Sequence, residues 1–172
     1  MARYGRWSNG SVTDQPRRAA YPSAIRLLAR RDLSAAQLKT KLLDHGLEPD
    51  EVDEAIERLR AERWLDDERT AETHARRIIG VKHRGERRAR QELEAVGIPA
   101  ETAARVVRLV LDELDETDVL EKAIARRLPG PIRDRAHFKR VYQALLRQGF
   151  AADQVAKALV ARVGGDLSFM EE

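Results

Sequence analysis

The sequence predicts an all-α protein made of three tandem three-helix modules in an elongated repeat arrangement. The first observation behind this is composition: of 172 residues, 42% are hydrophobic but only 5% aromatic. Alanine, leucine, glutamate and arginine dominate, which favours helix over strand. The second is a glycine turn that occurs three times at a nearly constant spacing. The third is a set of apolar positions that coincide when the three turns are aligned, which is typical of repeat proteins.

The repeated turn contains Gly46, Gly97 and Gly149, which are separated by 51 and 52 residues. Glycine after a helix adopts the left-handed conformation at low cost, and the next apolar residue then packs back onto that helix. The residues in this second position are Leu47, Ile98 and Phe150. Each turn should therefore join the second and third helices of a module. Because a β-branched residue resists positive φ, valine at any of the three glycines should cost about 1–2 kcal/mol.

The modules are predicted at residues 21–65, 66–115 and 116–163. The first helices should contain residues 25–28, 75–79 and 119–128. In module one, Ser34 and Gln37 form a capping-box pattern at the start of the middle helix, and Pro49 begins the third helix. In module two, Asp66 and Asp67 should cap the first helix.

Alignment on the glycines brings apolar residues of the three modules into register. The matched sets are Leu38, Ala89 and Val141; Leu42, Leu93 and Leu145; and Ile56, Val107 and Leu159. No segment shows sustained period-two alternation, so strands are not expected. Residues 1–20 are predicted to be a disordered basic tail, and residues 164–172 a C-terminal tail.

The charges are segregated along the chain, although the net charge is only +3. Residues 76–90 hold seven basic side chains against one acidic, and residues 121–140 hold seven against two. By contrast, residues 44–68 hold eleven acidic side chains against three basic. Such runs are often solvated helix faces with ion pairs. Their alternation favours a protein that contacts both a polyanion and a patterned protein surface.

Signals for enzymatic chemistry are weak. The chain has no cysteine, and its four histidines lack metal-ligand spacing. Phosphate-binding glycine loops and nucleophile-elbow motifs are absent. The acidic residues 66–68 could hold magnesium, but helix capping explains them better. We therefore expect a non-enzymatic protein with no cofactor and no metal.

The absence of cysteine and of long apolar runs also bears on location. No run of 18 apolar residues and no hydrophobic N-terminal segment occurs. We expect a cytoplasmic monomer that does not bind membranes.

The strongest candidate site is a basic segment in module two. Gly80 and Gly85 bracket a predicted loop, residues 81–84, between two helices. Forked guanidinium groups here could hold phosphates or carboxylates. The predicted partner- or polyanion-binding residues are Lys82, Arg84, Arg87, Arg88, Arg90, Arg76, Arg77, Arg126, Arg127, Arg133, Arg135, Lys139 and Arg140.

A second candidate is the junction of modules one and two, formed by Trp64, Leu65, Asp66 and Asp67. The simpler interpretation is that Trp64 is buried where the modules meet. The alternative is a partly exposed interaction anchor, since tryptophan is enriched at binding hot spots.

Residues 24–71, with the junction LDDERTA at 65–71, and residues 76–98 closely resemble the regulatory protein RecX family. The resemblance covers about residues 21–163, more loosely in module three. Thr70 stands where the family usually has an aromatic residue. The resemblance implies binding along the groove of the RecA–single-stranded DNA filament, with suppression of ATP hydrolysis and strand exchange. It thereby implies modulation of recombinational DNA repair and the SOS response.

Two other classes of function remain open from the residues alone. One is a direct DNA-binding protein, since three-helix modules can present a helix to a groove. The predicted third helix of module one is acidic, which is unfavourable in a major groove, so only weak, non-specific binding to bare DNA is expected. The other is a helical adaptor that contacts no nucleic acid.

Overall fold

The computed structural model describes residues 19–163, which contain nine α-helices and one π-helical segment. In chain order the elements are α1 (Ala20–Leu28), α2 (Ala35–Asp44), α3 (Pro49–Ala61), α4 (Asp67–Arg76), η1 (Arg77–Val81), α5 (Glu86–Glu94), α6 (Ala100–Leu114), α7 (Glu116–Ala125), α8 (Arg135–Arg147) and α9 (Ala152–Val160). Across this range there is no strand, only one isolated parallel bridge between Ile132 and Val163. The all-α prediction is confirmed.

The predicted tails fall largely beyond the part that the structure describes. Residues 1–18 and 164–172 lie outside the described residues. The predicted C-terminal boundary of the N-terminal tail, residue 20, is wrong by one residue. Ala20 is the first residue of α1 and is buried, because its methyl group packs in the core of the first three helices.

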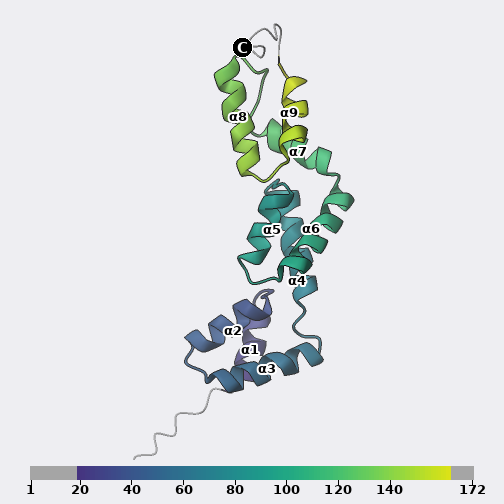
Figure 1. Cartoon of the computed structure of the whole chain (residues 1–172). Helices are drawn as coiled ribbons and strands as arrows, with labels where there is room; N and C mark the ends of the chain where they lie inside the picture. Colours follow the sequence, from purple (N-terminus) through teal and green to yellow (C-terminus); the bar gives the residue numbers. More distant parts are fainter. Residues whose placement is uncertain (1–18, 164–172) are drawn as a thin grey trace, which may run out of the picture.

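The helices form three groups of three that follow one another along a long axis (Figure 1). These groups are α1–α3, α4–α6 and α7–α9, and we call them modules one, two and three. The middle helices α2, α5 and α8 lie along the same side of the molecule in Figure 1. The elongated repeat arrangement predicted from the glycine spacing is therefore present.

Each glycine turn ends its middle helix in the same way. The φ angles are 76° at Gly46, 81° at Gly97 and 95° at Gly149. The amide after each glycine donates to the carbonyl five residues earlier: Leu47 to Leu42 at 3.3 Å, Ile98 to Leu93 at 3.2 Å, and Phe150 to Leu145 at 3.4 Å. This is the Schellman pattern, which satisfies carbonyls that a helix end leaves unpaired. Only a residue that tolerates positive φ fits here.

Two of the three turns also support the start of the middle helix of the preceding module. A Cβ on Gly97 would lie 2.3 Å from Cβ of Ala36, and a Cβ on Gly149 would lie 2.3 Å from the amide nitrogen of Arg88. The hydroxyl of Ser34 donates to the carbonyl of Val96 beside the Gly97 turn. Neighbouring modules are therefore in contact through glycine. Around the Gly46 turn, by contrast, a Cβ would meet no described atom within 4 Å.

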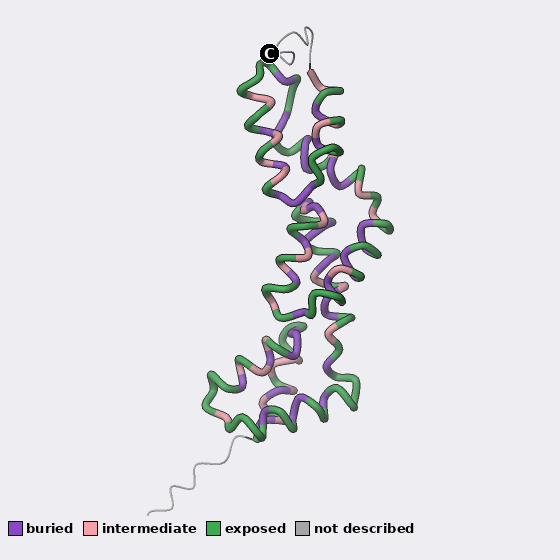
Figure 2. The backbone as a smooth tube through the Cα atoms, in the orientation of Figure 1, coloured by how far each residue is buried: buried purple, intermediate pink, exposed green. Residues whose placement is uncertain are grey.

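The buried side chains form two separate clusters. Figure 2 marks the buried residues along the backbone of all three modules. Module one has its own cluster, which includes the fully buried Leu38 and Leu42. Modules two and three share a single cluster that runs from Ala71 to Leu159. Hydrophobic burial therefore holds modules two and three together as one unit.

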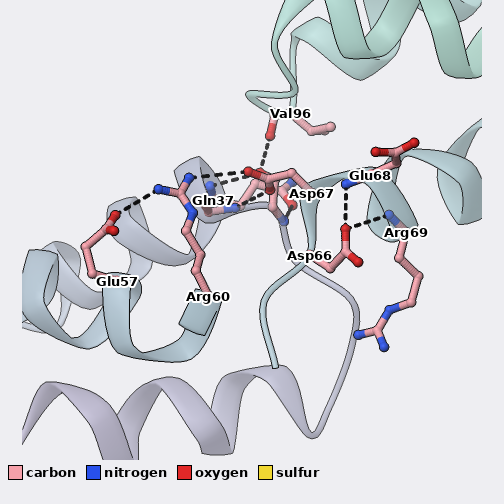
Figure 3. A network of polar contacts seen from close by, with 10 residues as sticks. Gln37, Glu57, Arg60, Asp66, Asp67, Glu68, Arg69 and Val96 are labelled. Carbon is pink, nitrogen blue, oxygen red and sulfur yellow. Dashed lines mark hydrogen bonds and ion pairs between the residues drawn. The ribbon is translucent and has the colours of Figure 1, made fainter. Parts of the chain in front are cut away.

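The contacts between modules one and two, in contrast, include a polar network (Figure 3). Asp66 caps α4 and accepts from the amides of Glu68 at 2.9 Å and Arg69 at 3.0 Å. Asp67 instead accepts from the amide of Ala35 at 2.7 Å and lies 3.5 Å from the guanidinium of Arg60. The prediction that both aspartates cap α4 is therefore wrong for Asp67. The Asp67 carboxylate instead accepts a hydrogen bond from the amide of Ala35, which has no partner within α2. Ala35 is distant in sequence and lies near Asp67 only in the folded structure.

Trp64 is not buried at the junction, so the simpler interpretation of this residue is wrong. Arg63 has φ of 59°, and the amides of Trp64 and Leu65 both donate to the carbonyl of Leu59, at 2.9 Å and 3.2 Å. This tight turn directs Leu65 into the core of module one, where it is 4% exposed. Trp64 consequently faces outward and is 58% exposed. It borders a hollow that Thr70 also lines.

Candidate polyanion-binding surface

The basic segment of module two begins on a helix rather than in a loop. Gly80 does not end a helix as predicted, because η1 continues through Val81. A short turn over residues 82–84 follows, and Gly85 is the N-cap of α5. A Cβ on Gly85 would lie 2.6 Å from the backbone of Gly149, so glycine is required for the close approach of module three. The segment therefore sits where modules two and three meet.

Three of the predicted site residues converge on one carboxylate. Glu92 on α5 lies 2.9 Å from Nζ of Lys82, 3.1 Å from Nε of Arg88 and 3.7 Å from Nε of Arg84. The Glu92 side chain is only 19% exposed. Burial raises the pKa of Glu92, but hydrogen bonds from Lys82 and Arg88 outweigh this effect, and its pKa falls below the ordinary value. The cluster is thus partly neutralised within the molecule.

The other predicted basic residues of module two also have contacts inside the chain. Arg76 pairs with Glu113 at 2.7 Å and Glu72 at 3.6 Å, and Arg90 lies 3.8 Å from Glu86. Arg87 donates to the carbonyl of Leu146 in module three at 2.6 Å. Arg77 is exposed and has no ion pair among the described residues. Much of this positive charge is therefore engaged in holding the fold.

His83 is a buried polar residue in this segment that the sequence did not single out. Its φ is 50°, it is 8% exposed, and its Nδ1 has no hydrogen-bond partner among the described atoms. Burial and the nearby charges of Arg126 and Lys122 lower its pKa. Arg126 also donates to the carbonyl of Val81 at 3.2 Å. The turn between η1 and α5 is thus covered by module three, and the lowered pKa of the buried His83 favours its neutral form.

The predicted basic residues of module three have a different environment. All are exposed, and the described part of the chain offers none of them an ion pair: Arg126, Arg127, Arg133, Arg135, Lys139 and Arg140. Helix α8 also carries Arg147, which the sequence analysis missed because it lies beyond the densest basic run. Ion pairs among the predicted residues are therefore confined to module two, where Arg77 and Arg87 lack them, and the predicted residues of module three have none within the described range.

A groove lies where module two meets module three. It has a volume of about 670 Å³ and runs between α5 and the turn from α8 to α9. On α5 it is lined by Arg87 and Arg90 and by the carboxylates of Glu86 and Glu94; in module three it is lined by Glu116, Leu146 and Phe150. A second hollow, between α2 and the Gly97 turn, occupies the matching place between modules one and two. Both hollows are lined by residues of a middle helix, α5 in the first and α2 in the second.

Comparison with known proteins gives the family. The family model described as the first three-helix domain of RecX matches residues 20–59. "Regulatory protein RecX" from Syntrophotalea carbinolica is 30% identical over 140 residues, which are 80% of this chain and 92% of the relative. The corresponding protein of Halorhodospira halophila is 37% identical over 147 residues, 83% of this chain and 88% of the relative. The chain belongs to the RecX family.

Some RecX relatives are longer than this chain. The RecX protein of Geobacillus kaustophilus is 32% identical over 158 residues, which cover 89% of this chain but 56% of that relative. Among solved structures, RecX from Lactobacillus salivarius superposes with a TM-score of 0.70 at 22% identity, over 83% of this chain and 95% of that one. That likeness shows the fold. As a RecX family member, the chain is a regulatory protein and not an enzyme.

Two further observations concern the described residues alone. Between residues 19 and 163, no helix combines the length and apolar character needed to cross a membrane. Over the same range, no three side chains of the metal-binding types gather closely enough to hold an ion.

The Glu92 cluster leads to a test of stability against pH. Glu92→Gln should lower the stability of modules two and three at pH 7, because it leaves Lys82, Arg84 and Arg88 without their shared anion. Folding depresses the pKa of Glu92, so its contribution is complete above the ordinary pKa of 4.5 and is lost as the pH falls through the lower folded value. Urea midpoints of parent and variant should therefore differ most above pH 4.5 and converge in acid.

The matched control is Glu94→Gln, which changes an exposed carboxylate on the same helix with no ion pair among the described residues. It should leave the midpoint nearly unchanged at every pH. Equal midpoints for the Glu92 variant and the parent at pH 7 would show that the cluster contributes nothing to folding.

Proposed function

We propose that this protein binds the RecA–single-stranded DNA filament and inhibits ATP hydrolysis and strand exchange by the recombinase. It would thereby modulate recombinational DNA repair and the SOS response. Membership of the RecX family supports the identity of the partner. The observation that carries the proposal is the distribution of opposite charges along an elongated, repeated frame.

The charges of the two ends differ in sign. Helix α3 of module one contains five acidic residues and two basic ones, and the acidic side chains are all exposed. Helix α8 of module three contains four basic residues and no acidic one. A nucleoprotein filament offers a basic protein surface and a phosphate backbone side by side. A rod with one acidic and one basic end has the complementary pattern.

Because the modules are connected, weak contacts between each module and the filament can add up to firm binding. Modules two and three share one core, and module one is joined to them through the junction at Asp67. Contacts made by connected modules reinforce one another, because the second contact forms at high effective concentration. Each module can therefore bind a filament subunit weakly while the whole chain binds firmly.

The test is the ATPase rate of the recombinase on single-stranded DNA with increasing amounts of this protein. We expect a saturating loss of most of the activity, and a parallel loss of strand exchange. An ATPase rate that stays constant at concentrations where the protein demonstrably binds the filament would refute the proposal.

The rival classes are separated by binding measurements at several salt concentrations. Bare DNA, the recombinase alone and the assembled filament serve as the three targets. Filament binding should be the strongest of the three. Tight, sequence-specific binding to a short duplex would favour a direct DNA-binding protein, and binding without any dependence on DNA would favour an adaptor.

A further inference from the structure

We propose that the exposed face of α8 is the surface that binds the phosphate backbone of nucleic acid, while the basic cluster of module two has a structural role. The inference rests on the proposed function only in taking that nucleic acid to be the DNA of the filament. The sequence offered thirteen candidate basic residues without indicating which of them contact DNA, and this proposal places the DNA contact on one helix.

The first argument is the geometry of α8. Its basic residues are Arg135, Lys139, Arg140 and Arg147, all exposed. At 3.6 residues per turn, these side chains and the exposed Gln143 fall within an arc of about 140° around the helix. The opposite side holds Val141 and Leu145, which are buried in the shared core. The arc also contains Ala136 and the partly buried Leu146, but no carboxylate of α8, so its charged side chains are all basic.

The second argument is the lack of internal partners. In module two, Lys82, Arg84 and Arg88 share Glu92, and Arg76 is paired with Glu113. For the four basic residues of α8, the described residues provide no ion pair within 4 Å. A cation that already has an ion pair must give up that pair before it can bind DNA, which costs free energy. An unpaired cation can bind a phosphate without that cost.

The third argument is that the arrangement is unfavourable for the helix itself. Arg135 is the first residue of α8, where the helix dipole is also positive, and Lys139 lies one turn further along the same side. Like charges four residues apart repel each other on a helix. The carboxylate of Asp134 caps this end by accepting from the amide of His137 at 2.7 Å, which offsets the dipole in part. The repulsion between Arg135 and Lys139 remains, and a contact with an external polyanion would relieve it.

The length of the face suits a strand. From residue 135 to residue 147 the helix rises about 18 Å. Along one strand of stacked DNA this corresponds to about five phosphates, at roughly 3.4 Å each. The surface ends on α8: the groove toward α5 is lined by the carboxylates of Glu86, Glu94 and Glu116 as well as by Arg87 and Arg90, and by none of the basic residues of α8. A DNA strand tolerates shifts in register along such a row, whereas an acidic protein surface would need matched positions.

The experiment measures binding of the full-length protein to a fluorescein-labelled oligo(dT) strand by anisotropy, without recombinase, between 50 and 200 mM NaCl. The variant is Arg135→Gln with Lys139→Gln, two exposed residues whose replacement removes no described contact. Affinity at low salt should fall by roughly tenfold or more, and the slope of log K against log salt should decrease by about 1.4, which is two lost phosphate contacts on a single strand. Circular dichroism should be unchanged.

The matched control is Arg76→Gln with Arg105→Gln, which removes the same charge from module two. Both residues are exposed and ion-paired, to Glu113 and Glu68. The control should keep the salt slope of the parent. An equal loss in the control would mean that only net charge matters, and the assignment to α8 would be wrong.

Further arms identify the nucleic acid and exclude a protein ligand. A duplex of the same length, measured in parallel, shows whether the face serves single or double strands, and a loss in either form supports the proposal. An α8 variant that keeps its affinity and salt slope with both oligo(dT) and the duplex overturns it. If that variant instead loses binding to the DNA-free recombinase, the face contacts an acidic protein surface. Because the strand assay contains no recombinase, its outcome is independent of the ATPase test.

Discussion

Gly149→Ala should destabilise modules two and three by roughly 2–5 kcal/mol, while Gly46→Ala should cost only about 1–2 kcal/mol. Both glycines have positive φ, so both variants carry the strain of a left-handed residue. Only Gly149 also faces another module: its added Cβ would lie 2.3 Å from the amide nitrogen of Arg88 and 2.6 Å from Cβ of that residue. That overlap cannot be relieved by rotating a side chain, so the modules must shift apart.

Urea unfolding followed by circular dichroism measures both costs, and Gly46→Ala is the matched control. The sequence alone predicted equal losses at the three glycines, because the pattern of the turns is the same. A loss at position 149 no greater than that at position 46 would show that the contact between modules two and three is not rigid.

Leu38→Ala and Leu145→Ala should affect different parts of the molecule, although each removes the same atoms from a fully buried leucine. Each should cost about 2–5 kcal/mol in the unit that contains it. Leu38 lies in the separate cluster of module one, so its variant should speed amide exchange mainly within residues 20–65. Leu145 lies in the cluster that modules two and three share, so its variant should speed exchange in both of these modules.

Native-state hydrogen exchange resolved by residue is the measurement. Each variant contains its own control. Exchange rates should stay unchanged in module one of the Leu145 variant, and in modules two and three of the Leu38 variant. Equal acceleration across all described residues in both variants would mean that the chain unfolds as one cooperative unit and that the two clusters are not independent.

The local features of the fold could be predicted from the sequence. The turns at Gly46, Gly97 and Gly149 depend on a backbone conformation that few other residues adopt, so the residue type alone indicates the structure. The capping box of Ser34 and Gln37 is likewise set by residues three positions apart, and it is present. The apolar residues aligned on the glycines are buried in all three modules for the same reason, since helical periodicity places them on one side.

Contacts between distant residues were decided by the tertiary structure. Asp67 and the amide of Ala35 are 32 positions apart, and nothing in either neighbourhood predicts that the aspartate caps α2. Trp64 is exposed because the turn at Arg63 directs Leu65 inward, and a positive φ at arginine has no reliable signal in sequence.

The candidate site shows the same division. By itself, the sequence determined that the chain is helical, repeated and basic in two runs, because these properties depend on residue type and spacing. Only the tertiary structure decided which charges are already paired: Glu92 is within reach of Lys82, ten positions away, because the turn before α5 folds back on that helix. On α8 no such partner is brought near within the described residues, so there the charge remains directed outward. Pairing depends on distances in space, which residue order does not specify.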